Sequence, residues 1–326
     1  MALTQIINFY MPNSHIRTRL NKRGLIWLVL LVLCLYVIVP QFHGFHASWH
    51  LLSHPNIWDV IVAMLFVIAT YFAAAATYCL LAFKRLPYVQ EFVIQLAAMF
   101  VNRLLPAGIG GIGANFEYLR RKGHNASEAA SVVATNNVLG IIGHALLLLV
   151  TLTLTASHNV LPTTNLKHSL ENTLKITVVI IAVGIILTII FSFERFRKAI
   201  KSVTKQLAEY RHRPLRITLA LLTQIGLTLT NVLSLSFSAL AVGIHLSFLV
   251  IFIIFTFGSG IRNITPTPGG IGGFEAGLVA GFVAYNIGGG RALAAVLLYR
   301  IVSYWLPLIA GAVAFVYAQQ KHWFRA

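Results

Sequence analysis

Leu105-Pro106-Ala107-Gly108-Ile109-Gly110-Gly111-Ile112-Gly113 and Thr265-Pro266-Thr267-Pro268-Gly269-Gly270-Ile271-Gly272-Gly273 are two proline- and glycine-rich stretches that interrupt long apolar regions, 91–119 and 247–287. Proline and clustered glycine break an α-helix. Unpaired backbone groups are costly in lipid, so such a break must be buried in protein or line a wet cavity. We therefore predict two re-entrant helical hairpins whose tips lie within the membrane.

Composition identifies the class of protein. Of 326 residues, 58% are hydrophobic and only 10% are charged, whereas an ordinary soluble domain carries about 25% charged residues. The apolar runs are long and continuous, which excludes a β-barrel. The net charge of +17 would suggest nucleic acid in a soluble protein, but here the basic residues separate apolar runs. We therefore predict an all-α polytopic membrane protein with no nucleic-acid partner.

Apart from the two broken regions, six apolar runs are predicted to cross the bilayer, since a helix needs about 20 residues to span it. They are 25–40, 57–83, 126–156, 174–193, 216–242 and 291–318. The expected organisation is a basic cytoplasmic N-terminus over 1–24, one membrane domain over 25–318 and a cytoplasmic tail over 319–326.

The distribution of Lys and Arg supports an orientation in the cell membrane. If both broken regions return to the side from which they enter, the cytoplasmic segments hold 19 basic residues and the outer ends hold 3. Such an asymmetry follows the positive-inside rule and predicts that both termini are cytoplasmic. Full crossing by the first broken region would move Arg120, Arg121 and Lys122 outside.

The two halves of the chain resemble each other at an offset of 159 residues. That offset aligns the two Gly-Gly-Ile-Gly segments, places Arg103 on Arg262, and places the 57–83 run on the 216–242 run. The alternative is a chance match in a glycine-rich membrane protein, but the arginine and helix offsets agree independently.

Each half is predicted to contain three crossings and one hairpin. Repeat A would cover 25–156 and repeat B would cover 174–318. Because three is odd, the second half enters the membrane from the opposite face. The result is an inverted-topology repeat of the kind found in secondary transporters, with a site where the broken helices meet.

The glycine tips have a possible use in binding an anion. A helix that begins after the break presents free N–H groups and the positive end of its dipole, which suits phosphate. The alternative is a purely structural turn. Glu117 and Glu275 follow the two tips, and a carboxylate in the membrane is a functional candidate by default. The alternative for Glu117 is a surface pair with Arg120 or Arg121.

Three arginines, Arg103, Arg262 and Arg300, are the only basic residues inside apolar regions. Their planar guanidinium groups can bind a phosphate with two hydrogen bonds. The alternative for Arg300 is a structural pair with Glu275. The predicted substrate-binding residues are Arg103, Pro106, Gly110, Gly111, Glu117, Arg262, Pro268, Gly269, Gly270, Gly272, Glu275 and Arg300. We predict no catalytic residue, metal or cofactor, because the P-loop, H-E-x-x-H and G-x-S-x-G motifs are absent from the sequence.

The segments Asn102–Gly111 and Pro266–Glu275, the latter followed by Ala294–Arg300, resemble the membrane region of lysylphosphatidylglycerol synthases. The wider group is one of flippase-like integral membrane proteins. The resemblance covers nearly the whole chain. It implies a bundle with re-entrant helices that moves a lipid between leaflets. Only a short tail follows residue 318, so we expect no soluble aminoacyl-transfer domain and no lysyl transfer by this chain.

Three functions remain open at this level. The first is a flippase or transporter for an anionic or modified phospholipid, or for a polyprenyl-linked glycan. The second is an accessory membrane subunit of a glycosyltransferase or another lipid-modifying enzyme. The third is a membrane-embedded enzyme acting on a polyprenyl phosphate, with Ser259 and Thr265 as candidate nucleophiles. We prefer the first, in which the chain is not an enzyme and its partners are membrane lipid and the bilayer.

Overall fold

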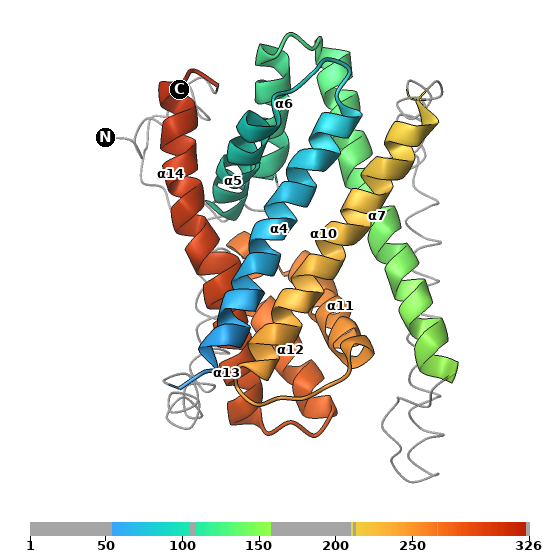
Figure 1. Ribbon diagram of the computed structural model, residues 1–326, viewed down its shortest axis with the longest axis vertical. Coiled ribbons are helices and arrows are strands. Elements are labelled where there is room, and N and C mark those ends of the chain that lie inside the picture. Colours follow the sequence, from blue (N-terminus) through green and yellow to red (C-terminus); the bar gives the residue numbers. More distant parts are fainter. Residues whose placement is uncertain (1–53, 105–108, 158–209, 211–212, 266, 324–326) are drawn as a thin grey trace, which may run out of the picture.

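The computed structural model describes residues 54–104, 109–157, 210, 213–265 and 267–323, and every regular element in these ranges is a helix (Figure 1). The α-helices are α4 (Ile57–Leu81), α5 (Tyr88–Leu104), α6 (Ile109–Arg121), α7 (Ala126–Ser157), α10 (Pro214–Leu240), α11 (Phe248–Ile264), α12 (Gly273–Ala284), α13 (Gly289–Arg300) and α14 (Leu306–Gln320). Two short turns complete the list, the 3₁₀ turn η3 (Pro268–Gly270) and the π-helical turn η4 (Ile301–Trp305).

Within the described residues, four helical segments are long and apolar enough to cross a membrane. They are Ile57–Leu81, Ala126–Thr151, Pro214–Leu240 and Gly289–Gln320. These four match the predicted runs 57–83, 126–156, 216–242 and 291–318. The other two predicted runs, 25–40 and 174–193, and the basic segment 1–24 lie outside the described residues. The structure thus confirms an all-α protein with several apolar helices, in which four of the six predicted spans can be compared.

Helices α4 and α10 form the centre of the bundle and run antiparallel to each other (Figure 1). Two hydroxyl pairs join them: Thr70 Oγ1 lies 2.8 Å from Thr230 Oγ1, and Thr77 Oγ1 lies 2.8 Å from Thr223 Oγ1. In each pair one hydroxyl donates to the other, and the accepting hydroxyl is placed to donate to a carbonyl of its own helix. The hydroxyls are therefore satisfied without water, which allows two apolar helices to pack closely.

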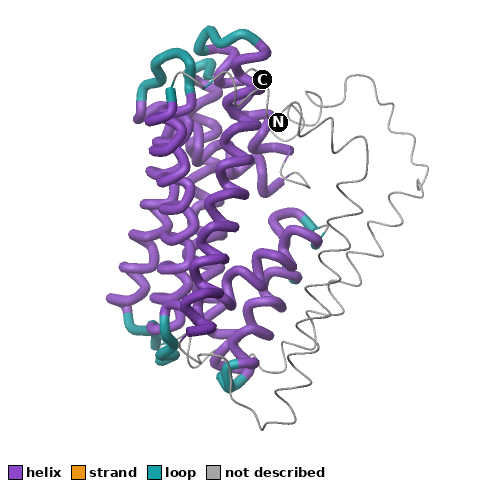
Figure 2. Tube along the Cα trace, turned by 90° about the vertical axis from the view of Figure 1, so that its right-hand side faces the viewer, coloured by secondary structure: helices purple, strands orange, loops and turns teal. Residues whose placement is uncertain are grey.

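Two helical hairpins pack against this centre from opposite ends. The pair α5–α6 starts and finishes at the end of the bundle where α4 ends, and α11–α12 starts and finishes at the other end (Figure 1). Figure 2 shows the described loops gathered at the two ends of the bundle, except for one at mid-height. That loop joins α11 to α12, so the break at 265–272 lies part-way between the two ends of the bundle. The second break falls where the Pro-Gly pattern predicted. For the first, α6 already begins at Ile109, so Gly110, Gly111 and Gly113 lie inside a helix rather than in a break, and 105–108 lie outside the described residues.

The tip of the second hairpin depends on glycine. Gly269, Gly270 and Gly272 have φ angles of 65°, 68° and 89°, a left-handed region that side chains with a Cβ rarely adopt. A Cβ on Gly270 would collide with the side chain of Arg262, and one on Gly269 would lie 2.7 Å from the ring of Tyr304. The turn can therefore lie directly against these two side chains.

Each hairpin has its own apolar core. One core is centred on Phe274, Leu278 and Phe282 of α12, which are at most 1% exposed and pack between α10, α11 and α13. The other is centred on Ile94 of α5 and Leu119 of α6, both fully buried. Polar side chains, among them Arg103, Arg262 and Arg300, lie between the two cores, where α5 approaches the tip of the α11–α12 hairpin.

Candidate functional site

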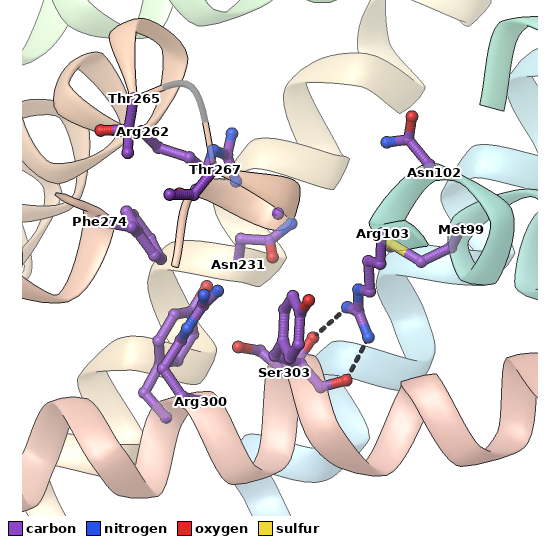
Figure 3. Close-up of a pocket in the computed structure, with 14 residues that line it drawn as sticks. Met99, Asn102, Arg103, Asn231, Arg262, Thr265, Thr267, Phe274, Arg300 and Ser303 are labelled. Atoms are coloured by element: carbon purple, nitrogen blue, oxygen red, sulfur yellow. Dashed lines mark hydrogen bonds between the residues drawn. The ribbon is translucent and has the colours of Figure 1, made fainter. Parts of the chain in front are cut away.

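A pocket of about 500 Å³ lies where α5, the tip of the α11–α12 hairpin and the α13–η4 junction come together (Figure 3). Its volume is in the range of ordinary small-molecule sites. The residues that line it are Met99, Asn102, Arg103, Asn231, Arg262, Thr265, Thr267, Gly269, Gly270, Phe274, Tyr299, Arg300, Ser303 and Tyr304. Elements from both halves of the chain therefore contribute to one site.

The pocket carries an excess of positive charge. Arg103, Arg262 and Arg300 all line it, and none of the residues lining it is Asp or Glu. The only carboxylate within salt-bridge distance of these arginines, among the described residues, is Glu275, which pairs with Arg300. Three cations and one anion leave a net charge of +2, which favours an anionic ligand.

Aromatic rings separate the three guanidinium groups. The Tyr304 ring centre lies 4.3 Å from Cζ of Arg103 and 4.3 Å from Cζ of Arg300. The Phe274 ring centre lies 5.3 Å from Cζ of Arg300 and 5.3 Å from Cζ of Arg262. A cation over an aromatic face is attracted by the ring quadrupole. The alternation of arginine and ring thus allows three like charges to share one pocket.

Arg103 is held by the backbone of the π-helical turn η4. Its guanidinium donates to the carbonyl oxygens of Ser303, at 2.7 Å, and Tyr304 (Figure 3). The Ser303 carbonyl lacks the usual helical donor four residues on, because Pro307 has no N–H, and the wider turn of η4 makes the helix irregular here. Arg103 therefore has a structural partner in addition to its place at the pocket.

Arg300 uses only some of its hydrogen-bond donors within the protein. Its Nε donates to Oε1 of Glu275 at 2.5 Å, and Oε2 of the same carboxylate accepts the N–H of Gly272 at 2.8 Å. Its Nη2 is buried and makes no hydrogen bond within the described part of the chain. Glu275 therefore already supplies an anion to the N-terminus of α12, so this helix end is not free for phosphate. The pairing of Arg300 with Glu275 is the structural alternative recognised from the sequence.

Arg262 has the fewest polar partners of the three arginines in the described part of the chain. Its side chain is exposed and makes no hydrogen bond or ion pair among the described residues. Its one contact of note is the cation–π contact with the ring of Phe274. In Figure 3 it extends from the end of α11 beside Thr265 and Thr267. Its guanidinium donors are therefore available to a ligand.

The other predicted site residues fall into two groups. Gly269 and Gly270 line the pocket. Gly272 caps α12, Pro268 begins η3, and Pro106 lies outside the described residues. Gly110 and Gly111 lie behind the pocket, against the backbone of Val101 and the side chain of Asn102.

Glu117 is not at the pocket. Its Oε1 accepts from Nε of Arg121 at 2.9 Å, and both side chains are partly exposed at 38% and 28%. This arrangement is the surface pair that the sequence allowed as an alternative.

Several residues at or near the site were not predicted. Phe274 and Tyr304 lie between the arginines. Nothing in the sequence marks them as site residues, except that Phe274 precedes Glu275 and Tyr304 lies four residues after Arg300. Asn231 lines the pocket from α10. Glu91, the first residue of the broken region 91–119, was not among the predicted site residues; it lies in the first turn of α5 and is fully buried. Its spacing of four residues from Gln95 in an apolar helix was the available signal.

Comparison with known families agrees with the resemblance. Residues 24–311 match the model of the lysylphosphatidylglycerol synthase TM region. No curated protein matches the chain. Because the match covers most of its length, the chain belongs to this family of integral membrane proteins associated with membrane lipid.

Proposed function

We propose that this member of the lysylphosphatidylglycerol synthase TM region family moves a lipid between the leaflets of the cell membrane. Its substrate would be an anionic or modified phospholipid, or a polyprenyl-linked glycan, and the chain itself would not be an enzyme. The observation that carries the proposal is the pocket between the two hairpins, with three arginines and no lining carboxylate.

The pocket has the donors that a phosphate requires. Arg262 and Nη2 of Arg300 are without hydrogen-bond partners in the described part of the chain, and both groups border the same space. Thr265 and Thr267 add hydroxyl groups beside them, although each already donates to a carbonyl. A phosphate bound here would accept charge-assisted hydrogen bonds, which are stronger than neutral ones.

The proposed architecture is an inverted repeat, and the bounds of the helices support it. An offset of 160, one more than the offset that aligns the glycine segments, carries the ends of α5, 88 and 104, onto 248 and 264, the ends of α11. Thr70 and Thr230, which also differ by 160, touch each other between antiparallel α4 and α10. Two residues at equivalent positions of the repeats touch each other where a twofold axis relating the repeats passes between their helices. Rocking of one repeat against the other would expose the pocket to alternate sides.

The described basic residues are consistent with the same model. Those at the end of the bundle where the α5–α6 hairpin opens are Lys84, Arg85, Arg120, Arg121, Lys122, Arg213, Arg216 and Lys321, whereas Arg291 begins α13 at the other end. We propose that the first end is cytoplasmic, that both termini lie there, and that both hairpins are re-entrant.

A reconstitution experiment tests the function. The purified chain is placed in vesicles of phosphatidylcholine and phosphatidylglycerol that contain a trace of NBD-labelled phosphatidylglycerol. Dithionite bleaches only label in the outer leaflet, so a flippase is expected to make all the label accessible. Arg262→Leu should abolish this movement. The matched control is Arg291→Leu, which removes an exposed arginine far from the pocket and should leave movement unchanged.

Other results would point to the alternatives. Lipid binding without movement, together with copurification of a glycosyltransferase, would favour an accessory subunit. Release of inorganic phosphate from a polyprenyl diphosphate by the pure protein would favour an enzyme that uses Thr265, the candidate nucleophile that lines the pocket.

A further inference from the structure

We propose that Glu91 is a proton-binding site that couples lipid movement to a proton gradient. This inference rests on the proposed function and adds the energy source. Glu91 is separate from the arginine pocket, yet a hydrogen-bonded path joins the two.

The burial of Glu91 is the first observation. The residue is 0% exposed. Its Oε1 accepts from Nε2 of Gln95 at 2.6 Å, whereas Oε2 is buried without a hydrogen-bond partner in the described part of the chain. A buried carboxylate with a single donor is costly, and a chain that needed only to pack would place a neutral residue here. Protonation of Oε2 removes the charge and therefore this cost.

The path to the pocket is the second observation. Nε2 of Gln95 also donates to Oδ1 of Asn115 at 2.7 Å, which joins α5 to α6. Nδ2 of Asn115 donates to the carbonyl of Gly111 at 2.9 Å. The N–H of Gly111 donates to Oδ1 of Asn102 at 3.2 Å, and Asn102 lines the pocket beside Arg103. Every link in this path lies within the α5–α6 hairpin.

The electrostatic surroundings of Glu91 are the third observation. The titratable groups that interact with it are Tyr78 and Cys79 of α4, Tyr118 of α6, and Lys122 after α6. Lys122 donates to Gln90 at 2.5 Å and forms no salt bridge with Glu91 in the described part of the chain, although its charge acts on the carboxylate. The hydroxyl of Tyr118 is also buried without a partner in this part of the chain. Helix α14 packs along α5 but carries no Asp, Glu, Lys, Arg or His.

Proton binding to Glu91 changes the strength of the first hydrogen bond in the path, from Gln95 to Glu91. When Glu91 is ionised, Gln95 donates to a carboxylate, and such charge-assisted bonds are about twice as strong as neutral ones. When a proton adds to Oε2, an O–H bond forms and Oε1 becomes a weaker neutral acceptor. Gln95 then holds Asn115 less firmly, which loosens α5 from α6 and shifts Asn102 and Arg103. Proton uptake thus favours a different arrangement of the hairpin, and this arrangement changes the positions of Asn102 and Arg103 at the lipid site.

The test uses the full chain in vesicles of phosphatidylcholine and phosphatidylglycerol with NBD-labelled phosphatidylglycerol, under a gradient of about one pH unit. If one proton moves per lipid, the label should become enriched up to about tenfold in one leaflet, because one pH unit equals a tenfold ratio at equilibrium. Glu91→Gln, which resembles the protonated form, should still move lipid but reach an even distribution. Glu117→Gln is the control on the same hairpin and should behave as the unmodified chain.

A second pair of measurements guards against a folding defect. Infrared difference spectra on acidification should show a carboxyl C=O band that Glu91→Gln lacks. Gln95→Leu should keep this band but lose the enrichment, because it breaks the path and leaves the acid.

The proposal is overturned if the unmodified chain moves lipid but never concentrates it, if Glu91→Gln keeps the enrichment, or if a sodium gradient drives it instead. In each case the flippase function itself stands. If the unmodified chain moves no lipid, the proposed function fails. The infrared band then decides separately whether Glu91 takes up a proton.

Discussion

Single residues in the pocket have unequal roles despite equal charge. Arg103 donates to two backbone carbonyls, Arg300 shares a carboxylate with the cap of α12, and Arg262 has no polar partner in the described part of the chain. From sequence the three arginines were equivalent candidates. Their partners now separate a residue that holds the fold from one that is free for a ligand.

The difference leads to opposite effects on stability. Arg103→Leu should lower the free energy of unfolding by about 1–3 kcal/mol, since the carbonyls of Ser303 and Tyr304 lose their donors. Arg262→Leu should leave it unchanged or higher, because no hydrogen bond is lost and one of three like charges is removed from the pocket. Thermal unfolding of both variants in detergent checks this. Equal destabilisation by both would show that Arg262 has a structural partner outside the described residues.

A histidine outside the spans makes stability depend on pH. The Nε2 of His124 accepts the N–H of Lys84 at 3.1 Å, so the ring proton is on Nδ1, which donates to the carbonyl of Leu119 at 3.1 Å. Burial lowers the pKa of His124 below its ordinary 6.5. The folded chain therefore holds the neutral ring, and its contribution to stability is present above pH 6.5 and is lost as the pH falls toward the lower folded pKa.

Replacing His124 by Gln should reduce this loss. The melting temperature of the unmodified chain should fall between pH 7 and pH 5 more steeply than that of the variant. Identical slopes would mean that the hydrogen bonds of His124 do not stabilise the neutral form.

At the scale of elements, the two interrupted hairpins determine where the pocket lies. The glycine tip of α11–α12 allows the chain to turn against Arg262 and Tyr304, and the irregular α13–η4–α14 helix provides the carbonyls that orient Arg103. In both places a break in regular helix, rather than the helix itself, forms part of the pocket wall.

The tip is therefore sensitive to a single methyl group. Gly270→Ala requires a left-handed backbone with a Cβ and a displaced Arg262 side chain, so it should weaken binding of NBD-labelled phosphatidylglycerol and lower thermal stability by about 1–3 kcal/mol. The control is Gly260→Ala in α11, where a Cβ meets nothing within 4 Å. If both variants bind lipid equally well, the tip is not part of the site.

At the scale of the whole molecule, the proposed inverted repeat predicts that the two hairpins open on opposite sides of the membrane. Ser127 follows the α5–α6 hairpin and Gly288 follows the α11–α12 hairpin, and both are exposed. In a background without Cys34 and Cys79, Ser127→Cys should react with an impermeant thiol reagent only from the cytoplasm. Gly288→Cys should react only from outside. Labelling of both from one side would contradict the inverted repeat.

The two helical hairpins, the four comparable spans and the break between α11 and α12, against which the pocket lies, could be predicted from sequence. These features depend on local composition: a run of apolar residues forms a spanning helix, and proline with clustered glycine interrupts it wherever it occurs. The same local reasoning identified Arg103, Arg262 and Arg300, because a charge inside an apolar run is visible without knowledge of its neighbours.

Tertiary structure alone decided which charged groups are free. Glu117 lies in a surface pair and Glu91 is buried, although both are on arms of the same hairpin, because each residue of a helix is rotated by about 100° from the last. The face that a side chain occupies matters only once the neighbouring helix is in place. For the same reason only the packed structure shows that Glu275 is occupied by Arg300 and Gly272, and that Tyr304 and Phe274 separate three arginines from distant parts of the chain.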